Sequence, residues 1–296
     1  MSRTQKLIGH ILAIIVVTIW SVTYVATDTL LSSGFTALHV IVLRFLLALI
    51  VLYIIKPKLY LPKSLKEEAG FVVLSLFGMG FYYVFENYAI QKTDGTNVSI
   101  LISFAPILTA LGTALIMKKS KITKFTLIGF AVAIVGVAMV VFNGTVRLDF
   151  DIVGYALALG AAACWGVYSM LLGDFLEKYD GTIITRRMLI YTLILLIPMT
   201  LIVDGAPNFA LLANPVNIAC FALLGIFGGS LCYLWWNMAT KRIGVVITTN
   251  YIYVSPFITM IFAYFVTNTE ITPMGAVGAV LIIGGVVLSD LNEKHT

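Results

Sequence analysis

A segment of 31 residues that occurs twice constrains the fold of this chain more than any other feature. Leu76–Pro106 and Ile226–Pro256 align without a gap at a constant offset of 150 residues. The alignment contains seven identical pairs: Phe77/Phe227, Gly78/Gly228, Tyr83/Tyr233, Asn87/Asn237, Ala89/Ala239, Ile102/Ile252 and Pro106/Pro256. Roughly two identities are expected by chance, and a fixed period of this length indicates an internal duplication. The sequence therefore predicts two related halves, residues 1–146 and 147–296.

The amino-acid composition indicates an integral membrane protein. Hydrophobic residues make up 60% and charged residues 11% of the 296 positions, against about 45–50% and about 25% in soluble domains. A helix needs about 20 apolar residues to cross the hydrocarbon core of a bilayer. The chain contains ten candidate runs: Leu7–Ala26, Phe35–Ile55, Ala69–Ile90, Thr96–Met117, Phe125–Phe142, Ile152–Leu172, Thr182–Val203, Val216–Thr240, Ile243–Val266 and Ile271–Leu288. We therefore predict an all-α integral membrane fold with ten transmembrane helices in the lipid bilayer.

Lysine and arginine residues are distributed unequally between the two sides of these spans. Sixteen lie on the side that holds both termini, and only Lys92 and Arg147 lie in loops on the other side. Cytoplasmic loops carry the excess of these residues in membrane proteins. We therefore expect both termini to be cytoplasmic and the protein to lie in the plasma (inner) membrane as a multi-pass protein.

Each predicted half contains five spans, which is an odd number. The second half must therefore enter the membrane upside down relative to the first. Inverted-topology repeats are found in secondary transporters, whose substrate sites lie near the bilayer midplane where the repeats meet. The connections are too short for a soluble nucleotide-binding domain and contain no P-loop motif, which excludes transport powered by ATP hydrolysis within this chain.

Several short elements recur in both halves, and together they are typical of one family. They are Trp165-Gly166 with its counterpart Trp20-Ser21, the pair Arg44-Phe45, the runs from Tyr88-Ala89 to Pro106 and from Met238-Ala239 to Pro256, and the glycine-spaced last helices. On these residues the chain resembles the EamA-type transporters of the drug/metabolite transporter superfamily, over about Leu7 to Leu288. Ser21 stands where the family usually has glycine, and Met188 follows Arg186-Arg187 where Arg-Phe is expected. The resemblance implies a ten-helix bundle with a central cavity and mainly the export of small metabolites, amino acids or drugs.

Two ionisable residues lie deep within predicted spans. Arg44 lies near the middle of the second span, where an arginine costs at least about 2.5 kcal/mol and needs a partner or water. Glu86 in the third span is favoured as its charge partner over Asp28, which lies at the outer end of the first. The pair is interpreted either as a couple that touches substrate or proton, or as a structural pair that fixes helix packing.

Glu86 is the candidate with the clearest chemistry. Tyr82 lies one helical turn before it on the same face. A carboxylate beside aromatic rings can hold an organic cation, or the amino group of an amino acid, through charge and cation–π attraction. The same group can instead carry a coupling proton. The alternative is a hydrated residue near the interface.

The other candidates come from the aromatic and polar positions around the repeats. The predicted substrate-binding residues are Trp20, Tyr24, Tyr82, Glu86, Ser103, Trp165, Trp236 and Tyr253. Pro106 and Pro256 each remove a backbone hydrogen bond, so we expect them to kink their helices and shape the cavity or act as hinges. Asn87 and Asn237 are interpreted equally as hydrogen-bonding links between helices or as substrate contacts.

Other functions have little support in the sequence. The three histidines are isolated and no HExxH or GxSxG motif is present, so no catalytic residue, metal or cofactor is predicted. No basic patch with interleaved aromatic residues points to nucleic acid, and the net charge of +5 is explained by membrane orientation.

The sequence thus predicts a secondary transporter that exports a small organic metabolite, an amino acid or an organic cation, by alternating access. A coupling proton and a monomer or homodimer are both compatible with it. A passive channel needs a continuous polar pore, for which the spans supply few positions. An intramembrane enzyme needs a nucleophile and a base that face each other. These two remain the alternatives.

Overall fold

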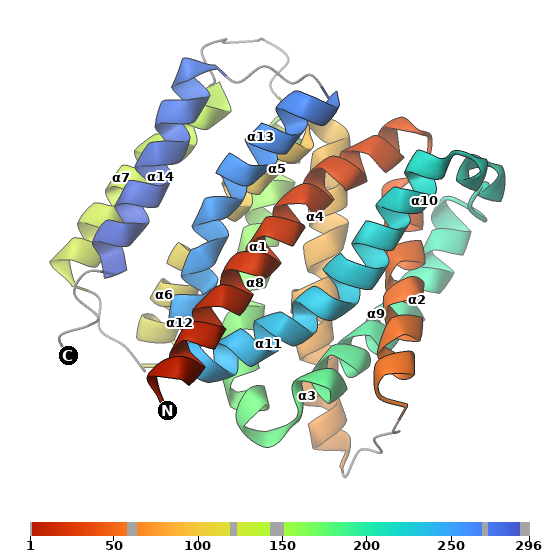
Figure 1. The fold of residues 1–296 in the computed structure, drawn as a ribbon, viewed down its shortest axis with the longest axis horizontal. Coiled ribbons are helices and arrows are strands. Elements are labelled where there is room, and N and C mark those ends of the chain that lie inside the picture. The colour runs from red at the N-terminus through yellow and green to blue at the C-terminus, as the bar shows by residue number, and fades with distance from the viewer. Residues whose placement is uncertain (1, 58–63, 119–122, 143–150, 268–271, 291–296) are drawn as a thin grey trace.

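The protein is a bundle of helices (Figure 1). The computed structural model describes residues 2–57, 64–118, 123–142, 151–267 and 272–290, and every regular element within these ranges is helical. In this part of the chain eight continuous runs are long and apolar enough to cross a membrane: Arg3–Ser32, Ala37–Ile55, Leu65–Lys92, Gly95–Leu115, Ile152–Lys178, Gly181–Val203, Pro215–Ile243 and Val245–Val266. The predicted all-helical membrane fold is therefore confirmed.

The helices of the two halves follow the same order. The first half contains α1 (Arg3–Ser32), α2 (Ala37–Ile55), α3 (Leu65–Ser75), η1 (Leu76–Gly80), α4 (Phe81–Lys92), α5 (Gly95–Ile102), α6 (Ala105–Leu115) and α7 (Lys124–Phe142). The second contains α8 (Ile152–Lys178), α9 (Gly181–Val203), η2 (Phe209–Ala213), α10 (Pro215–Ala222), η3 (Leu223–Leu231), α11 (Cys232–Ile243), α12 (Val245–Asn250), η4 (Tyr251–Val254), α13 (Ser255–Thr267) and α14 (Pro273–Asp290). The predicted fifth and tenth spans are helical as α7 and α14, with shorter apolar parts at Leu127–Gly136 and Pro273–Gly285.

Acidic residues start several helices by capping them. Asp151 accepts a hydrogen bond from the backbone N–H of Gly154 at 2.9 Å, and Asp180 accepts one from Thr182 at 2.9 Å. Such caps satisfy backbone donors that have no partner within the helix. These caps explain why α8 and α9 begin directly after Asp151 and Asp180.

The two copies of the repeated segment are irregular at equivalent places. Both η1 and η3 are wider, π-helical segments within an otherwise α-helical run. Pro106 follows a break between α5 and α6, and Pro256 follows the tighter 3-10 segment η4. Each proline thus lies in the first turn of a new helix, where its missing N–H is tolerated. The interruptions fall where the sequence predicts kinks.

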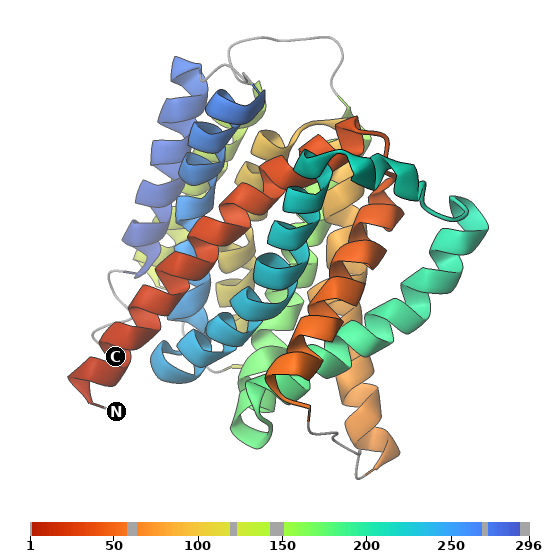
Figure 2. The same cartoon turned by 45° about the vertical axis from the view of Figure 1, so that its right-hand side comes forward.

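The two halves run in opposite directions (Figures 1 and 2). α1 begins at the end of the bundle that holds both termini, whereas α8 begins at the opposite end. The contacts between halves are reciprocal: α1 packs against α11 as α8 packs against α4, and α7 pairs with α14. This exchange is what a two-fold relation between the halves produces.

The pairing of α7 with α14 depends on glycine. A Cβ atom added to Gly136 would lie 2.5 Å from the carbonyl oxygen of Gly278, and one added to Gly285 would collide with the carbonyl of Gly129. Both obstacles are backbone atoms, which cannot rotate away. Gly136 and Gly285 therefore serve close packing of these two helices.

Candidate functional site

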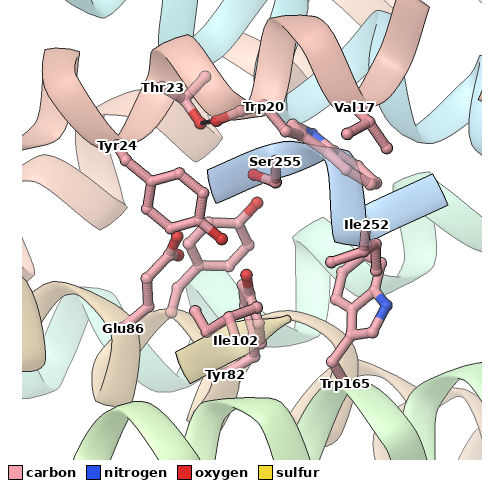
Figure 3. Close-up of a pocket in the computed structure, with 11 residues that line it drawn as sticks. Val17, Trp20, Thr23, Tyr24, Tyr82, Glu86, Ile102, Trp165, Ile252 and Ser255 are labelled. Atoms are coloured by element: carbon pink, nitrogen blue, oxygen red, sulfur yellow. Dashed lines mark hydrogen bonds between the residues drawn. The ribbon is translucent and has the colours of Figure 1, made fainter. Parts of the chain in front are cut away.

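A small cavity lies between the two halves (Figure 3). Its volume is about 20 Å³, which is room for about one water molecule. Its lining comes from both halves: Val17, Trp20, Thr23, Tyr24, Tyr82, Tyr83, Glu86, Ile102, Trp165, Ile252 and Ser255. Of the predicted substrate-binding residues it thus brings together Trp20, Tyr24, Tyr82, Glu86 and Trp165.

Two tryptophans, Trp20 and Trp165, line the cavity, and a third, Trp236, packs against both of them. The ring of Trp20 lies 5.2 Å from that of Trp165 and 5.0 Å from that of Trp236, measured between centroids. The indole N–H of Trp20 donates a hydrogen bond to the carbonyl of Gly228 at 3.0 Å, which fixes the ring. Trp236 is 1% exposed and does not line the cavity.

Glu86 is the single charged residue of the lining. It is 5% exposed, and its Oε2 atom has no hydrogen-bond partner. The carboxylate lies beside the ring of Tyr24 and faces the cavity (Figure 3). A buried carboxylate oxygen without a partner is costly, so this group is available to a cationic ligand or to a proton.

Arg44 and Glu86 interact through their charges, but no ion pair within 4 Å joins these two described residues. Whether they act as a functional pair stays a prediction. The guanidinium carbon of Arg44 lies 4.4 Å from the centroid of the Tyr83 ring, and its Nε has no hydrogen-bond partner. Arg44 lies outside the lining. Cation–π attraction, which a linear sequence does not reveal, holds it in place.

Two other predicted contact residues lie outside the cavity lining. Ser103 is buried, and its hydroxyl donates to the carbonyl of Ser99 at 2.9 Å within the helix. Tyr253 packs with Phe130 and Ile282 in a separate cluster beside α7 and α14. In each copy the neighbouring isoleucine, Ile102 or Ile252, lines the cavity instead.

The sequence also contains signals for residues that were not predicted. Ile102 and Ile252, an identical pair of the duplicated segment, both line the cavity. The hydroxyl of Tyr233 donates to that of Tyr83 at 3.4 Å, so this identical pair meets where the halves join. Two of the identical pairs, Ile102/Ile252 and Tyr83/Tyr233, therefore lie where the two halves meet. Val17, Thr23 and Ser255 carry no comparable signal.

The repeated asparagines link helices. Asn87 donates to the carbonyl of Ala37 at 3.4 Å, at the start of α2. Asn237 donates to the carbonyl of Gly181 and to the hydroxyl of Thr185, both at 3.1 Å, at the start of α9. Neither lines the cavity, which favours the structural interpretation.

The loop carboxylates outside the spans differ in their electrostatics. Burial raises the pKa of Asp94, although hydrogen bonds from Asn97 and Thr96 oppose this effect. The hydrogen bond from the backbone of Gly154 lowers the pKa of Asp151, and nearby Lys92 adds to it.

The donor set of the cavity does not suit a metal ion. It offers one carboxylate and neither histidine nor cysteine. In the described ranges no three histidine, cysteine, aspartate or glutamate residues come together as ligands. The site is suited instead to an organic group that contacts aromatic rings.

An all-helical membrane bundle of two duplicated, opposed halves around an aromatic site defines the transporter class. The model of the EamA-like transporter family matches residues 7–142 and again residues 152–289. The chain therefore belongs to the EamA-like transporter family, and the resemblance predicted from the motifs is confirmed.

Relatives with curated descriptions are transporters as well. An uncharacterized transporter of Archaeoglobus fulgidus is 28% identical over 256 residues, which is 85% of this chain and 87% of that protein. A probable terminal-alkyne amino-acid exporter of Streptantibioticus cattleyicolor is 27% identical over 213 residues, 71% of this chain and 69% of the relative. A solved crystal structure shares the fold with a TM-score of 0.72 at 18% identity, covering 100% of both chains.

Proposed function

We propose that this protein is a secondary transporter that exports a small organic cation or an amino acid by alternating access. In this proposal ten helices cross the plasma membrane as two inverted five-helix repeats, residues 1–146 and 147–296, with both termini in the cytoplasm. The unequal distribution of lysine and arginine and the opposed directions of the halves support this orientation. The exporter relative supports the direction of transport.

The observation that carries the proposal is the unpartnered carboxylate of Glu86 in an aromatic cavity. An ammonium group placed there would gain the charge of Glu86 and the faces of Tyr24 and Tyr82. A coupling proton on the same carboxylate would compete with that ligand. A cavity with room for about one water favours a carrier over a passive channel, because a channel needs a continuous pore.

Replacing Glu86 tests the proposal. Ligands are first found by thermal-shift measurements on detergent-solubilised protein against amino acids and amines, because a ligand that binds the native state raises its apparent stability. Glu86→Gln should then lower exchange of the identified ligand in proteoliposomes by more than about tenfold, since one lost charge contact costs over about 1.4 kcal/mol.

The matched control is Glu67→Gln, which neutralises a carboxylate on α3 outside the cavity and should leave exchange unchanged. Melting temperatures close to that of the parent would show that both variants fold. Unchanged exchange with an unchanged pH dependence in Glu86→Gln would contradict both roles of this residue.

A further inference from the structure

A second, larger pocket lies at the end of the bundle that holds the termini. Its volume is about 500 Å³, within the range of small-molecule sites. We call it the vestibule. It is lined by Thr113, Met117, Met170, Gly173, Asp174, Leu176, Glu177, Thr240, Lys241, Ile243, Gly244, Val245, Val246 and Ile247. These residues belong to α6 and the bend after it, to α8, α11 and α12, and to the turn between the last two helices, so both halves contribute.

The charge of the vestibule favours a cation. Among its described lining residues are two carboxylates, Asp174 and Glu177, and one ammonium group, Lys241. The side chain of Thr240 is 5% exposed, and its hydroxyl has no hydrogen-bond partner although the residue lines the pocket. A buried hydroxyl without a partner is satisfied by a ligand or by water. The lining is therefore acidic near the end of α8 and polar near the end of α11.

The rest of the lining suits an apolar body. Met117 and Met170 contribute flexible, polarisable side chains that adapt to ligands of different shape. Val245 and Ile247 add aliphatic surface from α12. A ligand with one positive charge and an apolar remainder would match both parts of the lining.

The vestibule and the central cavity lie about one to two helical turns apart. On α8, Trp165 lines the cavity and Gly173 lines the vestibule, with the unpartnered hydroxyl of Ser169 midway between them. On α11, Thr240 of the vestibule lies four residues, about 6 Å of helix rise, after Trp236, whose ring contacts Trp20. Trp236 thus stands between the two spaces.

We propose that the vestibule is a second binding site, which takes an organic cation with an apolar body before that cation reaches Glu86. This inference rests on the proposed transport function, and it assigns the entry side to the end with the termini. The acidic residues concentrate the cation, and movement of Trp236 admits it to the central cavity.

Cysteine labelling tests the charge of the vestibule without requiring transport. Cys164, Cys220 and Cys232 are replaced by serine, and Val246→Cys places one thiol in the lining. The trimethylammonium-ethyl methanethiosulfonate reagent should react about tenfold faster than the sulfonatoethyl reagent, after correction for their rates with free thiol, because a charged cleft concentrates ions of opposite sign. Asp174→Asn with Glu177→Gln should remove this preference, and Glu67→Gln should not. Equal rates, or a preference that survives neutralisation, would overturn the proposal.

Protection by a model cation tests binding. Tetraphenylphosphonium should slow the reaction of Val246→Cys with neutral N-ethylmaleimide in the parent and equally in Glu86→Gln, and should fail to do so after Asp174→Asn with Glu177→Gln. Protection that depends on Glu86 but not on Asp174 and Glu177 would place the cation in the central cavity alone. That result, or no protection at all, would refute the vestibule site and leave the proposed transport function to its own test.

Discussion

The turn in the middle of each repeated segment occupies an equivalent place, but the two turns differ in how tightly they close. In the first copy, a Cβ atom added to Gly95 would lie 2.9 Å from the backbone oxygen of Tyr24 on α1. In the second copy, Val245 stands in place of Gly95, and Ser169 on α8 corresponds to Tyr24. Val245 contacts Gly173, one helical turn after Ser169. No atom lies within 4 Å of a Cβ added to Gly244.

The same turns are anchored alike on their other side. A Cβ atom added to Gly154 would lie 2.7 Å from Thr93, and one added to its counterpart Gly9 would lie 2.8 Å from Ile243. The two halves therefore share the tight contact at Gly9 and Gly154, and they differ in the contact that the turn makes at Gly95 or Val245. Among the described residues, the turn at Gly95 packs tightly at the end away from the termini, and the vestibule lies at the end that holds them. The two copies of a duplicated sequence can thus pack differently in one structure.

The largest effect is expected where the turn packs most tightly. Gly95→Val, which introduces the residue of the second copy, would overlap the backbone of α1 and cost about 1–3 kcal/mol. Because 1.4 kcal/mol is about tenfold in population, a Val98→Cys reporter, 1% exposed in the parent, should react with N-ethylmaleimide about tenfold faster. Gly173→Ala at the end that holds the termini faces a movable side chain and should leave that rate unchanged. An unaltered rate in a folded Gly95→Val protein would show that this contact does not hold the end closed.

A smaller difference is expected between the repeated asparagines. Asn237→Ala removes two hydrogen bonds of 3.1 Å and should lower the free energy of unfolding by about 1 kcal/mol, whereas Asn87→Ala removes a single bond of 3.4 Å and should cost about half as much. Melting temperatures in detergent measure the difference. Equal losses would mean that the two copies are joined to their neighbours with equal strength.

The smallest effect is a pH dependence of the cap of α9. α9 is capped by Asp180, which pairs with Lys56 at 3.1 Å, whereas α2 is capped by the uncharged hydroxyl of Thr36, which also donates to Asp204 at 2.6 Å. Burial opposes ionisation, but hydrogen bonds from Thr182 and Lys56 outweigh it and lower the pKa of Asp180. A lowered pKa contributes stability above the unfolded value, and this stability is lost as the pH falls through the folded value.

Asp180→Asn should therefore lower the free energy of unfolding by less than about 1 kcal/mol at neutral pH, seen as a slightly lower melting temperature. In acid its melting temperature should match that of the parent. A deficit in Asp180→Asn that persists in acid would assign the effect to the cap rather than to the charge.

The sequence predicted the helices well because the signal for a span is local. The observed Ala37–Ile55 and Gly181–Val203 differ from the predicted spans by at most two residues at either end. α1 is longer at both ends than the predicted Leu7–Ala26, since its polar ends remain helical beyond the apolar run. The π-helical segments η1 and η3 were not predicted, because they alter hydrogen bonding without altering hydropathy.

The site was predicted in part. Trp20, Trp165 and Glu86 were found because aromatic and charged residues are conspicuous in apolar runs. Tyr253 was predicted from its depth and Ser103 from its polar side chain, but the hydroxyl of Ser103 bonds within its own helix and Tyr253 packs in a separate cluster. The vestibule had no sequence signal, because its residues come from four helices of both halves.

The sequence by itself determined that this chain is a duplicated helical membrane protein of the transporter type. The length of the apolar runs, the repeat period and the charges of the loops can all be read from the linear sequence. Only the tertiary structure decided that the guanidinium of Arg44 lies over the ring of Tyr83, and that the turn at Gly95 packs tightly against α1 while the turn at Gly244 has free space around it. The physical reason is that each helix satisfies its backbone hydrogen bonds within itself. Contacts between helices depend instead on side chains that lie about 150 residues apart in the sequence. Two alternative packings of such segments can differ in free energy by only a few kcal/mol.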